Sequence, residues 1–400
     1  MKRWKITILP CLPILALAIL FVPDLGVAAA AARSTDGSRP TTTCGQWNVI
    51  PSPNAPKGGS ALISVASISA HDVWAVGDSV RMVGGSQTYR TLTEHWNGTT
   101  WSIVPSPSPG PKFQIIDILF GVAATSTNDV WAVGEEDKAN PTAYVEHWNG
   151  SQWSVISTPL VPNAISVTLT SVAVISANDV WAAGYYGDSA GTLFTLVEHW
   201  NGTQWRIVSS PNVGSHGSRL AGVAVISAND AWAVGTYGTS STTFAALIEH
   251  WDGTRWKVVS NPNVSSPGLT AVTAIATNDV WSVGSYSPNN NANTLAEHWN
   301  GTKWSMVSSP NAPKSSFNKL NAVAAVASKN VWSVGEDTLN SALTEHWNGT
   351  QWKLVSSPMV GAVANLNGVT VVPGTRQLWA VGGFYQTFRS LSATLIEFYC

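Results

Sequence analysis

Short runs of apolar and β-branched residues alternate with turn residues along almost the whole chain. In the part between residues 167 and 209 there are four such runs: Val167–Ser176, Val180–Tyr186, Phe194–Trp200 and Gln204–Ser209. Each has the length of a strand, and no segment of the sequence shows sustained helical periodicity. The pattern therefore predicts an all-β chain in which four strands follow one another within about 50 residues.

Two sequence motifs mark the repeats of this pattern. The first is Glu-His-Trp followed by Asn-Gly or Asp-Gly, at intervals of about 48 to 52 residues. Its copies begin at Glu94, Glu146, Glu198, Glu249, Glu297 and Glu345. The second is Asp-Val-Trp-Ala-Val-Gly or a close variant, which precedes each copy of the first, and an altered seventh pair lies between Leu378 and Cys400. Repeats of four strands and this length are typical of β-propeller blades.

An Asn-Gly or Asp-Gly pair links the third run to the fourth in six repeats. Because both central residues of a type I′ turn need positive φ, Asn-Gly between two strands favours a tight two-residue hairpin. We therefore expect such a turn at Asn201 and Gly202 and at the equivalent pairs. The copies that read Asn-Gly-Thr also match a glycosylation acceptor, but the turn alone explains them. These copies begin at Asn97, Asn201, Asn300 and Asn348.

The count of conserved strand positions within the chain indicates seven blades. The tryptophans of the second run and of the fourth run each occur seven times. The first fourth-run tryptophan, Trp47, precedes every complete repeat, and the last repeat lacks this strand. The simplest arrangement completes a seventh blade from residues 366–400 and 44–53, which removes the exposed edge of an open array. The sequence predicts one seven-bladed β-propeller over residues 44–400, closed by its N-terminal strand.

Two cysteines lie at the ends of this predicted domain. Alignment of the last repeat puts Cys400 at the Asn position of the Asn-Gly turn, and alignment back from Trp47 puts Cys44 at the Gly position. Two unrelated free thiols are the alternative. The coincidence favours a Cys44–Cys400 disulfide in place of the missing peptide link, in an exported and oxidising setting.

Residues 1–32 differ from the repeats. A basic start at Lys2–Lys5 precedes the apolar run Ile6–Val22, and small residues follow, as in a secretory signal. An uncleaved membrane anchor is the alternative, although the run is barely long enough to span a bilayer. Residues 33–43 have the composition of a Ser/Thr linker. We therefore expect a secreted protein with no membrane insertion after the signal is cleaved.

The charge of the chain argues against one class of partner. The formal net charge is −2, and no basic run occurs beyond the N-terminus, so charge-driven binding to nucleic acid is not expected. Charged residues make up 11% of the chain, well below the roughly 25% usual in soluble domains. Thr, Ser, Asn and Gly supply the polarity instead, which suits exposed strands and turns.

The tryptophans and most of the histidines fall on repeated positions. Of the 21 tryptophans, Trp4 lies in the predicted signal and the others lie on second, third or fourth runs, which favours packing between blades over a sugar-binding role. Six histidines lie on third runs of six different blades and cannot converge on one metal ion at bond lengths of roughly 2 Å. No metal or cofactor is therefore expected. The last repeat lacks both the Asp and the His, so we expect an Asp–His hydrogen bond within each of the other blades.

These motifs resemble those of known propeller families. The Asp–His–Trp set and the shared closing strand resemble WD-type propellers, and Asp252–Trp256 is similar to a shortened Asp-box of sialidase-like propellers. Kelch repeats are a poorer match, because their paired glycines are missing. The resemblance, to secreted bacterial seven-bladed repeat proteins in general, covers residues 44–400 and lies in the framework, so it implies fold and not activity. The arginine triad and the Tyr/Glu pair of sialidases have no counterpart.

A ligand face is expected on the loops that join second to third runs and fourth to first runs. These loops vary in length and chemistry on a regular scaffold, which is where specificity usually lies. The acidic candidates, which follow the second-run Gly, are Asp78, Glu135, Glu136, Glu336 and Asp337. The aromatic candidates are Tyr185, Tyr186, Tyr237, Tyr286 and Tyr385. They predict an acidic arc over blades 6, 1 and 2 and an aromatic arc over blades 3 to 5, with solvated loop tips as the alternative.

Three functions fit this prediction. The leading one is a secreted, monomeric, non-enzymatic propeller that binds a glycan or an extracellular protein through the variable loop face. The alternative is a glycoside hydrolase or lyase, which needs two carboxyls within roughly 5 to 10 Å of each other; no catalytic residue stands out. The third is an assembly scaffold at the cell surface.

Overall fold

The structure is a computed structural model that describes residues 42–109, 116–136, 141–289, 291–338, 341–388 and 390–400. The predicted signal and nearly all of the predicted linker lie outside these residues. The described part of the chain contains 28 strands and no helix. The all-β prediction is therefore confirmed.

The strands form seven groups of four, and the last group includes the first strand of the chain. Blade 1 consists of β2 (Gly59–Ser69), β3 (Asp72–Val83), β4 (Ser86–Trp96) and β5 (Trp101–Ile103). Blade 2 consists of β6 (Asp117–Ser126), β7 (Asp129–Glu136), β8 (Tyr144–Trp148) and β9 (Trp153–Val155). Blade 3 consists of β10 (Ser166–Ser176), β11 (Asp179–Gly187), β12 (Leu193–Trp200) and β13 (Trp205–Val208). Blade 4 consists of β14 (Ser218–Ser227), β15 (Asp230–Gly238), β16 (Phe244–Trp251) and β17 (Trp256–Val258). Blade 5 consists of β18 (Gly268–Ala276), β19 (Asp279–Tyr286), β20 (Asn293–Trp299) and β21 (Trp304–Val307). Blade 6 consists of β22 (Asn318–Ala327), β23 (Asn330–Asp337), β24 (Ala342–Trp347) and β25 (Trp352–Leu354). Blade 7 consists of β26 (Val363–Val371), β27 (Leu378–Tyr385), β28 (Ser392–Tyr399) and β1 (Trp47–Val49).

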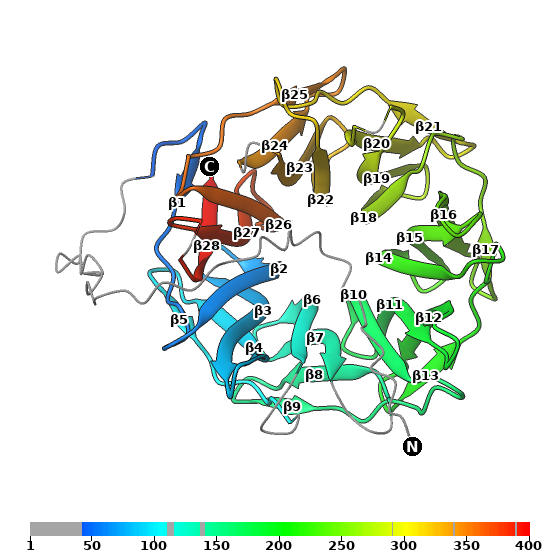
Figure 1. The fold of residues 1–400 in the computed structure, drawn as a ribbon, viewed down its shortest axis with the longest axis horizontal. Coiled ribbons are helices and arrows are strands. Elements are labelled where there is room, and N and C mark those ends of the chain that lie inside the picture. Colours follow the sequence, from blue (N-terminus) through cyan, green and yellow to red (C-terminus); the bar gives the residue numbers. More distant parts are fainter. Residues whose placement is uncertain (1–41, 110–115, 137–140, 290, 339–340, 389) are drawn as a thin grey trace. The chain divides into compact units, whose positions relative to one another are not determined.

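Within each blade, the strands pair with their neighbours in antiparallel order. Five sheets have four strands, and a single residue pair, Thr168 with Glu135, joins blades 2 and 3 into one eight-stranded sheet. The first strand of each blade contacts the first strand of the next, and β26 contacts β2. Figure 1 shows these first strands nearest the centre and the fourth strands at the outside. The fold is a seven-bladed β-propeller.

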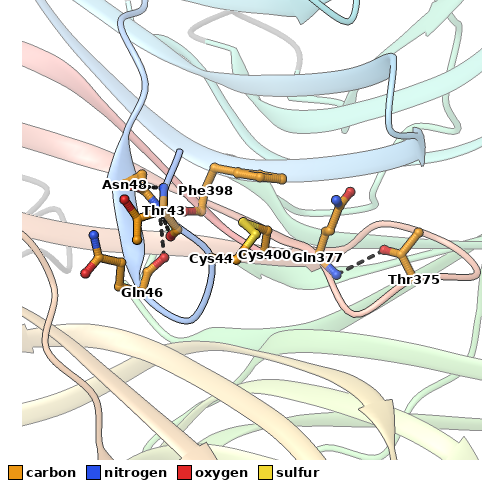
Figure 2. The surroundings of a disulfide bond; sticks show 8 residues. All are labelled: Thr43, Cys44, Gln46, Asn48, Thr375, Gln377, Phe398 and Cys400. Atoms are coloured by element: carbon orange, nitrogen blue, oxygen red, sulfur yellow. Dashed lines mark hydrogen bonds between the residues drawn. A yellow bond between two sulfur atoms is a disulfide. The ribbon is translucent and has the colours of Figure 1, made fainter. Parts of the chain in front are cut away.

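The N-terminal strand β1 pairs with β28, as the sequence predicts. Trp47 lies opposite Tyr399, and the backbone N–H of Gly45 donates to the carbonyl of Cys400 at 2.9 Å. The predicted Cys44–Cys400 disulfide is present beside this pair (Figure 2). The first strand of blade 7 begins at Val363, three residues before the predicted boundary of the blade. The pairing of β1 with β28 and the Cys44–Cys400 disulfide thus join the two ends of the domain.

The cores of the propeller lie between neighbouring blades. Trp181 of blade 3 packs against Trp251 and Trp256 of blade 4, with ring centroids 5.0 and 5.6 Å apart, and its other face stacks on His199 at 4.2 Å. The predicted pair is present, since His199 Nε2 lies 2.7 Å from Asp179 Oδ1. Blades 1, 2, 4 and 5 repeat this bond at 2.6 to 2.9 Å, and in blade 6 an Asn takes the place of the Asp. The tryptophans of the described residues and the six third-strand histidines belong to the framework, as predicted.

The Asn-Gly turns differ from the expected type I′ hairpin, so that expectation is wrong. Trp200 pairs with Trp205, which leaves four residues in the loop, and only Gly202 has a positive φ, of 90°. The Asn201 side chain Oδ1 accepts the backbone N–H groups of Thr203 and Gln204, both at 3.1 Å. These two hydrogen bonds stabilise the turn without a positive φ at Asn201. Asn side chains commonly hydrogen-bond the nearby backbone in this way.

The glycine that ends the Val-Trp-Ala-Val-Gly motif is required by a β-bulge in the first strand. In blade 3 the register of β10 against β11 shifts between Leu169 and Ser171. A Cβ on Gly184 would lie 2.0 Å from the carbonyl oxygen of Thr168. Glycine is therefore required at this position of the motif, because any side chain would collide with the backbone of the neighbouring strand.

A glutamate on the third strand of every blade is fully buried. The set is Glu94, Glu146, Glu198, Glu249, Glu297, Glu345 and Glu397. Burial raises the pKa of each carboxyl to about 7 or about 8, because a low-dielectric interior disfavours the charged form. A serine from the loop after the preceding blade's fourth strand donates to several of them, as Ser210 does to Glu249 at 2.7 Å. The carboxyls of Glu146, Glu249, Glu345 and Glu397 thus link neighbouring blades, and all seven are shielded from solvent.

Candidate functional site

The predicted loop-face residues lie at or near the ends of second strands, except Asp78 in the middle of β3, and their side chains point in two directions. Side chains alternate along a strand, so residues two apart share a side. Trp181 and Ala183 pack with blade 4, which places Tyr185 toward blade 4, whereas Tyr186 packs against the core shared with blade 2. The first position after the Gly therefore faces the following blade and the second faces the preceding one. The first set is Asp78, Glu135, Tyr185 and Glu336, and the second set is Glu136, Tyr186, Tyr237, Tyr286 and Asp337.

The predicted aromatic residues of blades 3 to 5 are mostly packed into the framework. Tyr186, Tyr237 and Tyr286 are partly buried against three successive cores between blades. Tyr186 also stacks on Phe194, with ring centroids 5.2 Å apart. These rings extend the cores toward the loop face. Tyr385 differs, because it is the last residue of β27 and is 41% exposed.

One predicted acid of each of blades 1 and 2, Asp78 and Glu136, faces the junction between these blades, whereas Glu135 faces blade 3. Asp78 of blade 1 is partly buried, and burial raises its pKa to about 7. Glu136 and the fully buried Asp117 are paired neighbours on β7 and β6. Burial raises the pKa of Tyr144, and the charges of Glu146, Asp117 and Glu136 raise it further. The structure therefore gathers several carboxyls at one junction.

Sequence reasoning did not identify Tyr144 or Asp117 as part of this junction. Tyr144 pairs with the motif glycine of blade 2, where the other six blades have leucine, so the departure from the repeat is visible in the sequence. The Tyr144 hydroxyl donates to Glu146, and Ser106 donates to the same carboxyl at 2.7 Å. Ser108 donates to Asp117 at 2.7 Å. These bonds hold residues 106 to 108, which follow β5, against blade 2.

The acids of blades 2 and 6 that face other junctions are also engaged. Thr168 Oγ1 donates to Glu135 at 3.1 Å, and Asp337 Oδ1 accepts the Ser341 backbone N–H at 3.1 Å. Glu336 lies opposite Lys319 in the register of β22 and β23. The acidic residues thus organise loops and blade junctions. No group of three or more His, Cys, Asp or Glu among the described residues could hold a metal ion.

Four exposed apolar side chains lie on two neighbouring loops, the loop that joins β25 of blade 6 to β26 of blade 7 and the loop between β27 and β28, or at the strand end beside them. We call Met359, Tyr385, Phe388 and Leu391 the apolar loop patch; their exposed fractions are 92%, 41%, 74% and 63%. The loop that carries Met359 is bound to the end of β27, since the Ala362 N–H donates to the Tyr385 carbonyl at 2.8 Å. Tyr385 in turn pairs with Ser392, the residue after Leu391. The patch therefore lies on two segments that both adjoin the end of β27.

A recess lies between the loops of blades 3 and 4. Its volume is about 290 Å³, and three loops form its walls: the loop between β11 and β12, the loop between β13 and β14, and the loop between β15 and β16. The lining residues are Ala190, Gly191, Thr192, Ser215, His216, Ser240, Ser241 and Phe244. None of them was singled out by the sequence, because the loops converge only in the fold.

One further property concerns membranes. Within the residues that the structure describes, no helix is long and apolar enough to cross a bilayer.

Comparisons with known proteins identify the fold. No protein-family model matches the chain, and no curated protein matches its sequence. The structure described as YCF48 bound to D1 peptide is 13% identical, with a TM-score of 0.54, and the match covers 91% of this chain and 98% of that one. The WD40 repeats of RRP9 are 11% identical, with a TM-score of 0.55 and coverage of 88% and 97%. A protein of unknown function from Dyadobacter fermentans is 11% identical, with a TM-score of 0.51 and coverage of 89% and 98%. At these identities the likeness shows the fold alone, which is that of a β-propeller.

Proposed function

We propose that the chain is a secreted, monomeric β-propeller that binds an extracellular protein through the apolar loop patch. The observation that carries this proposal is the exposure of Met359, Tyr385, Phe388 and Leu391 on two segments that adjoin the end of β27 in blade 7. Single exposed apolar residues are normal, but a group of large ones on a soluble surface is typical of an interaction site.

The chemistry of the patch favours a polypeptide partner. Met, Phe and Leu side chains offer no hydrogen-bonding groups, so a ligand gains mainly by covering them with its own apolar side chains. Aromatic residues and Met are also enriched at protein interfaces, and Tyr385 adds a hydroxyl at one end of the patch. YCF48, which has the same fold, has been solved with a bound peptide. That precedent supports a propeller in this role.

The disulfide supports a location outside the cytoplasm. A structural disulfide persists in oxidising compartments, and the Cys44–Cys400 bond joins the two ends of the domain. Together with the secretory signal predicted in residues 1–32, it favours a secreted protein. The enzyme alternative has less support, because its candidate carboxyls Glu135, Glu136 and Glu336 face different blade junctions.

The test is affinity capture of proteins from the culture medium and cell surface of the source organism. The bait is the disulfide-closed chain, compared with the double variant Phe388→Ser/Leu391→Ser and with Leu354→Ser. Leu354 is a matched control, since it is 38% exposed on the outer strand β25 and is not one of the four residues of the apolar loop patch. We expect one set of proteins to bind the unchanged chain and the control and to be lost from the double variant.

Two results would contradict the proposal. One is capture of the same proteins by the double variant, provided its unfolding midpoint equals that of the control. The other is a dimer in sedimentation of the unchanged chain that becomes a monomer in the double variant, because the patch would then be a contact between two copies.

A further inference from the structure

We infer that the recess between blades 3 and 4 is a binding site for an uncharged saccharide. This site is separate from the apolar loop patch, and the inference does not depend on the protein-binding function proposed above. It rests on the shape of the recess, the rigidity of its walls and the chemistry of its lining.

The walls of the recess are fixed by hydrogen bonds within the loops. Asp188 Oδ1 accepts the backbone N–H groups of Ala190 and Thr192, both at 2.9 Å, which closes the loop of blade 3. In blade 4, Ser240 Oγ accepts the N–H groups of Thr242 and Thr243, at 3.2 and 3.1 Å. A ligand that enters such loops loses little free energy in ordering them, and this preorganisation favours binding.

Residues 213–217 form the middle wall of the recess. Two glycines, Gly217 and Gly238, allow this segment to lie between the two blades. A Cβ on Gly238 of β15 would lie 2.7 Å from the His216 backbone oxygen, so only glycine lets the segment approach. The Gly238 N–H donates to the Gly217 carbonyl at 2.8 Å. Gly217 itself has a φ of 87° and lies against Leu193 of blade 3. His216 is therefore held at the junction by backbone contacts on both sides.

The imidazole of His216 is oriented with one nitrogen left for a ligand. Its Nδ1 is hydrogen-bonded to Ser215 Oγ at 2.8 Å, and Nε2 has no partner among the described residues. His216 is exposed, so the free nitrogen is open to solvent. An imidazole nitrogen can either donate to or accept from a sugar hydroxyl, depending on the tautomer.

The remaining lining residues supply the other features that a saccharide needs. Thr192, Ser215, Ser240 and Ser241 carry hydroxyls, which hydrogen-bond sugar hydroxyls as donor or acceptor. Phe244 is 46% exposed and offers an apolar surface for the C–H groups of a sugar ring. The lining contains no Asp, Glu, Lys or Arg, which argues against an ion or a strongly charged ligand. The volume of about 290 Å³ lies at the lower end of ligand pockets, which favours one or two sugar rings.

Saturation-transfer-difference NMR can test this inference, because it detects weak binding. The probes are the methyl glycosides of glucose, galactose, mannose and N-acetylglucosamine, with sialic acid methyl glycoside as the charged comparator. We expect transfer to at least one neutral glycoside by the disulfide-closed chain. His216→Ala and Phe244→Ala should each weaken that binding about tenfold or more, and Ala190→Trp, which fills the recess without removing a polar group, should abolish the signal.

Two controls separate this site from other surfaces. His71 is also exposed and outside the framework set, but it lies at the turn between β2 and β3, so His71→Ala should leave the signal unchanged. The double variant Phe388→Ser/Leu391→Ser should also leave the saturation-transfer signal unchanged, even if it no longer binds protein partners. The inference is overturned if no neutral glycoside binds the folded chain, if sialic acid binds better than every neutral probe, or if Ala190→Trp leaves binding intact.

Discussion

The substitution Glu198→Gln should change how the stability of this propeller depends on pH. Glu198 lies on β12, fully buried, and neither carboxyl oxygen has a hydrogen-bond partner in the described part of the chain. Burial raises its pKa from 4.5 to about 8. Gln has nearly the same shape and does not titrate, so the variant removes one proton equilibrium and little packing.

The sign follows from proton linkage. A group whose pKa is raised in the folded state binds more protons when folded, so its contribution to stability is fully present below pH 4.5 and is lost as pH rises toward 8. Each pKa unit is worth about 1.4 kcal/mol, so between about pH 4.5 and 7 the loss from Glu198 is roughly 3 kcal/mol. The other six buried glutamates add losses of the same sign, and these are common to both proteins.

The assay is urea unfolding with the disulfide intact, repeated across this pH range. The difference in unfolding free energy between Glu198→Gln and the unchanged chain isolates the contribution of Glu198. We expect this difference to grow in favour of the variant by roughly 3 kcal/mol between about pH 4.5 and 7. Glu336→Gln, at a partly exposed position, controls for the loss of one acidic side chain. Parallel pH curves for Glu198→Gln and the unchanged chain would refute the reasoning.

Three further substitutions test the framework. Asp179→Ala and His199→Ala should destabilise the fold by similar amounts, about 1 to 3 kcal/mol each, because each leaves the other partner of a partly buried bond unpaired; unequal losses in urea unfolding would count against the pairing. Cys44→Ser should lower stability by up to about 6 kcal/mol in the chain-entropy model, since the bond to Cys400 closes a loop with a sequence separation of 356; a thermal midpoint equal to that of the unchanged chain would argue against this. Gly184→Ala should be among the most damaging changes in the chain, because its Cβ would lie 2.0 Å from a backbone oxygen, and soluble expression with an unchanged midpoint would contradict the bulge.

The repeated features could be predicted from the sequence because each position occurs six or seven times. The Asp179–His199 bond, the packing of Trp181 between blades and the Cys44–Cys400 link all follow from comparing copies of one repeat. The turn at Asn201 was predicted with the wrong geometry, because the capping ability of the Asn side chain competes with its tolerance of positive φ.

The loop face was less predictable, for two physical reasons. Strand alternation sends Glu135 and Glu136 to opposite blade junctions, although they are adjacent in sequence. If this alternation is ignored, residues such as Glu135 and Glu136 are assigned to one site, although they face different blade junctions. The recess at His216 and Phe244 is lined by three loops that are separated in sequence by strands, so only the fold brings its lining together.

The framework also explains why the two proposed sites can be independent. Each blade carries its own second-strand tryptophan, and blades 1 to 6 each carry their own bond from an acid or amide to a histidine ring, so the framework is repeated blade by blade. The apolar loop patch belongs to blade 7, whereas the recess at His216 belongs to blades 3 and 4. Substitutions far apart with no shared partners usually add without coupling. Changes at Phe388 and at Phe244 should therefore act separately, and a loss of saccharide binding in the Phe388 variant would mean that the loops, and not the blades, are the unit of function.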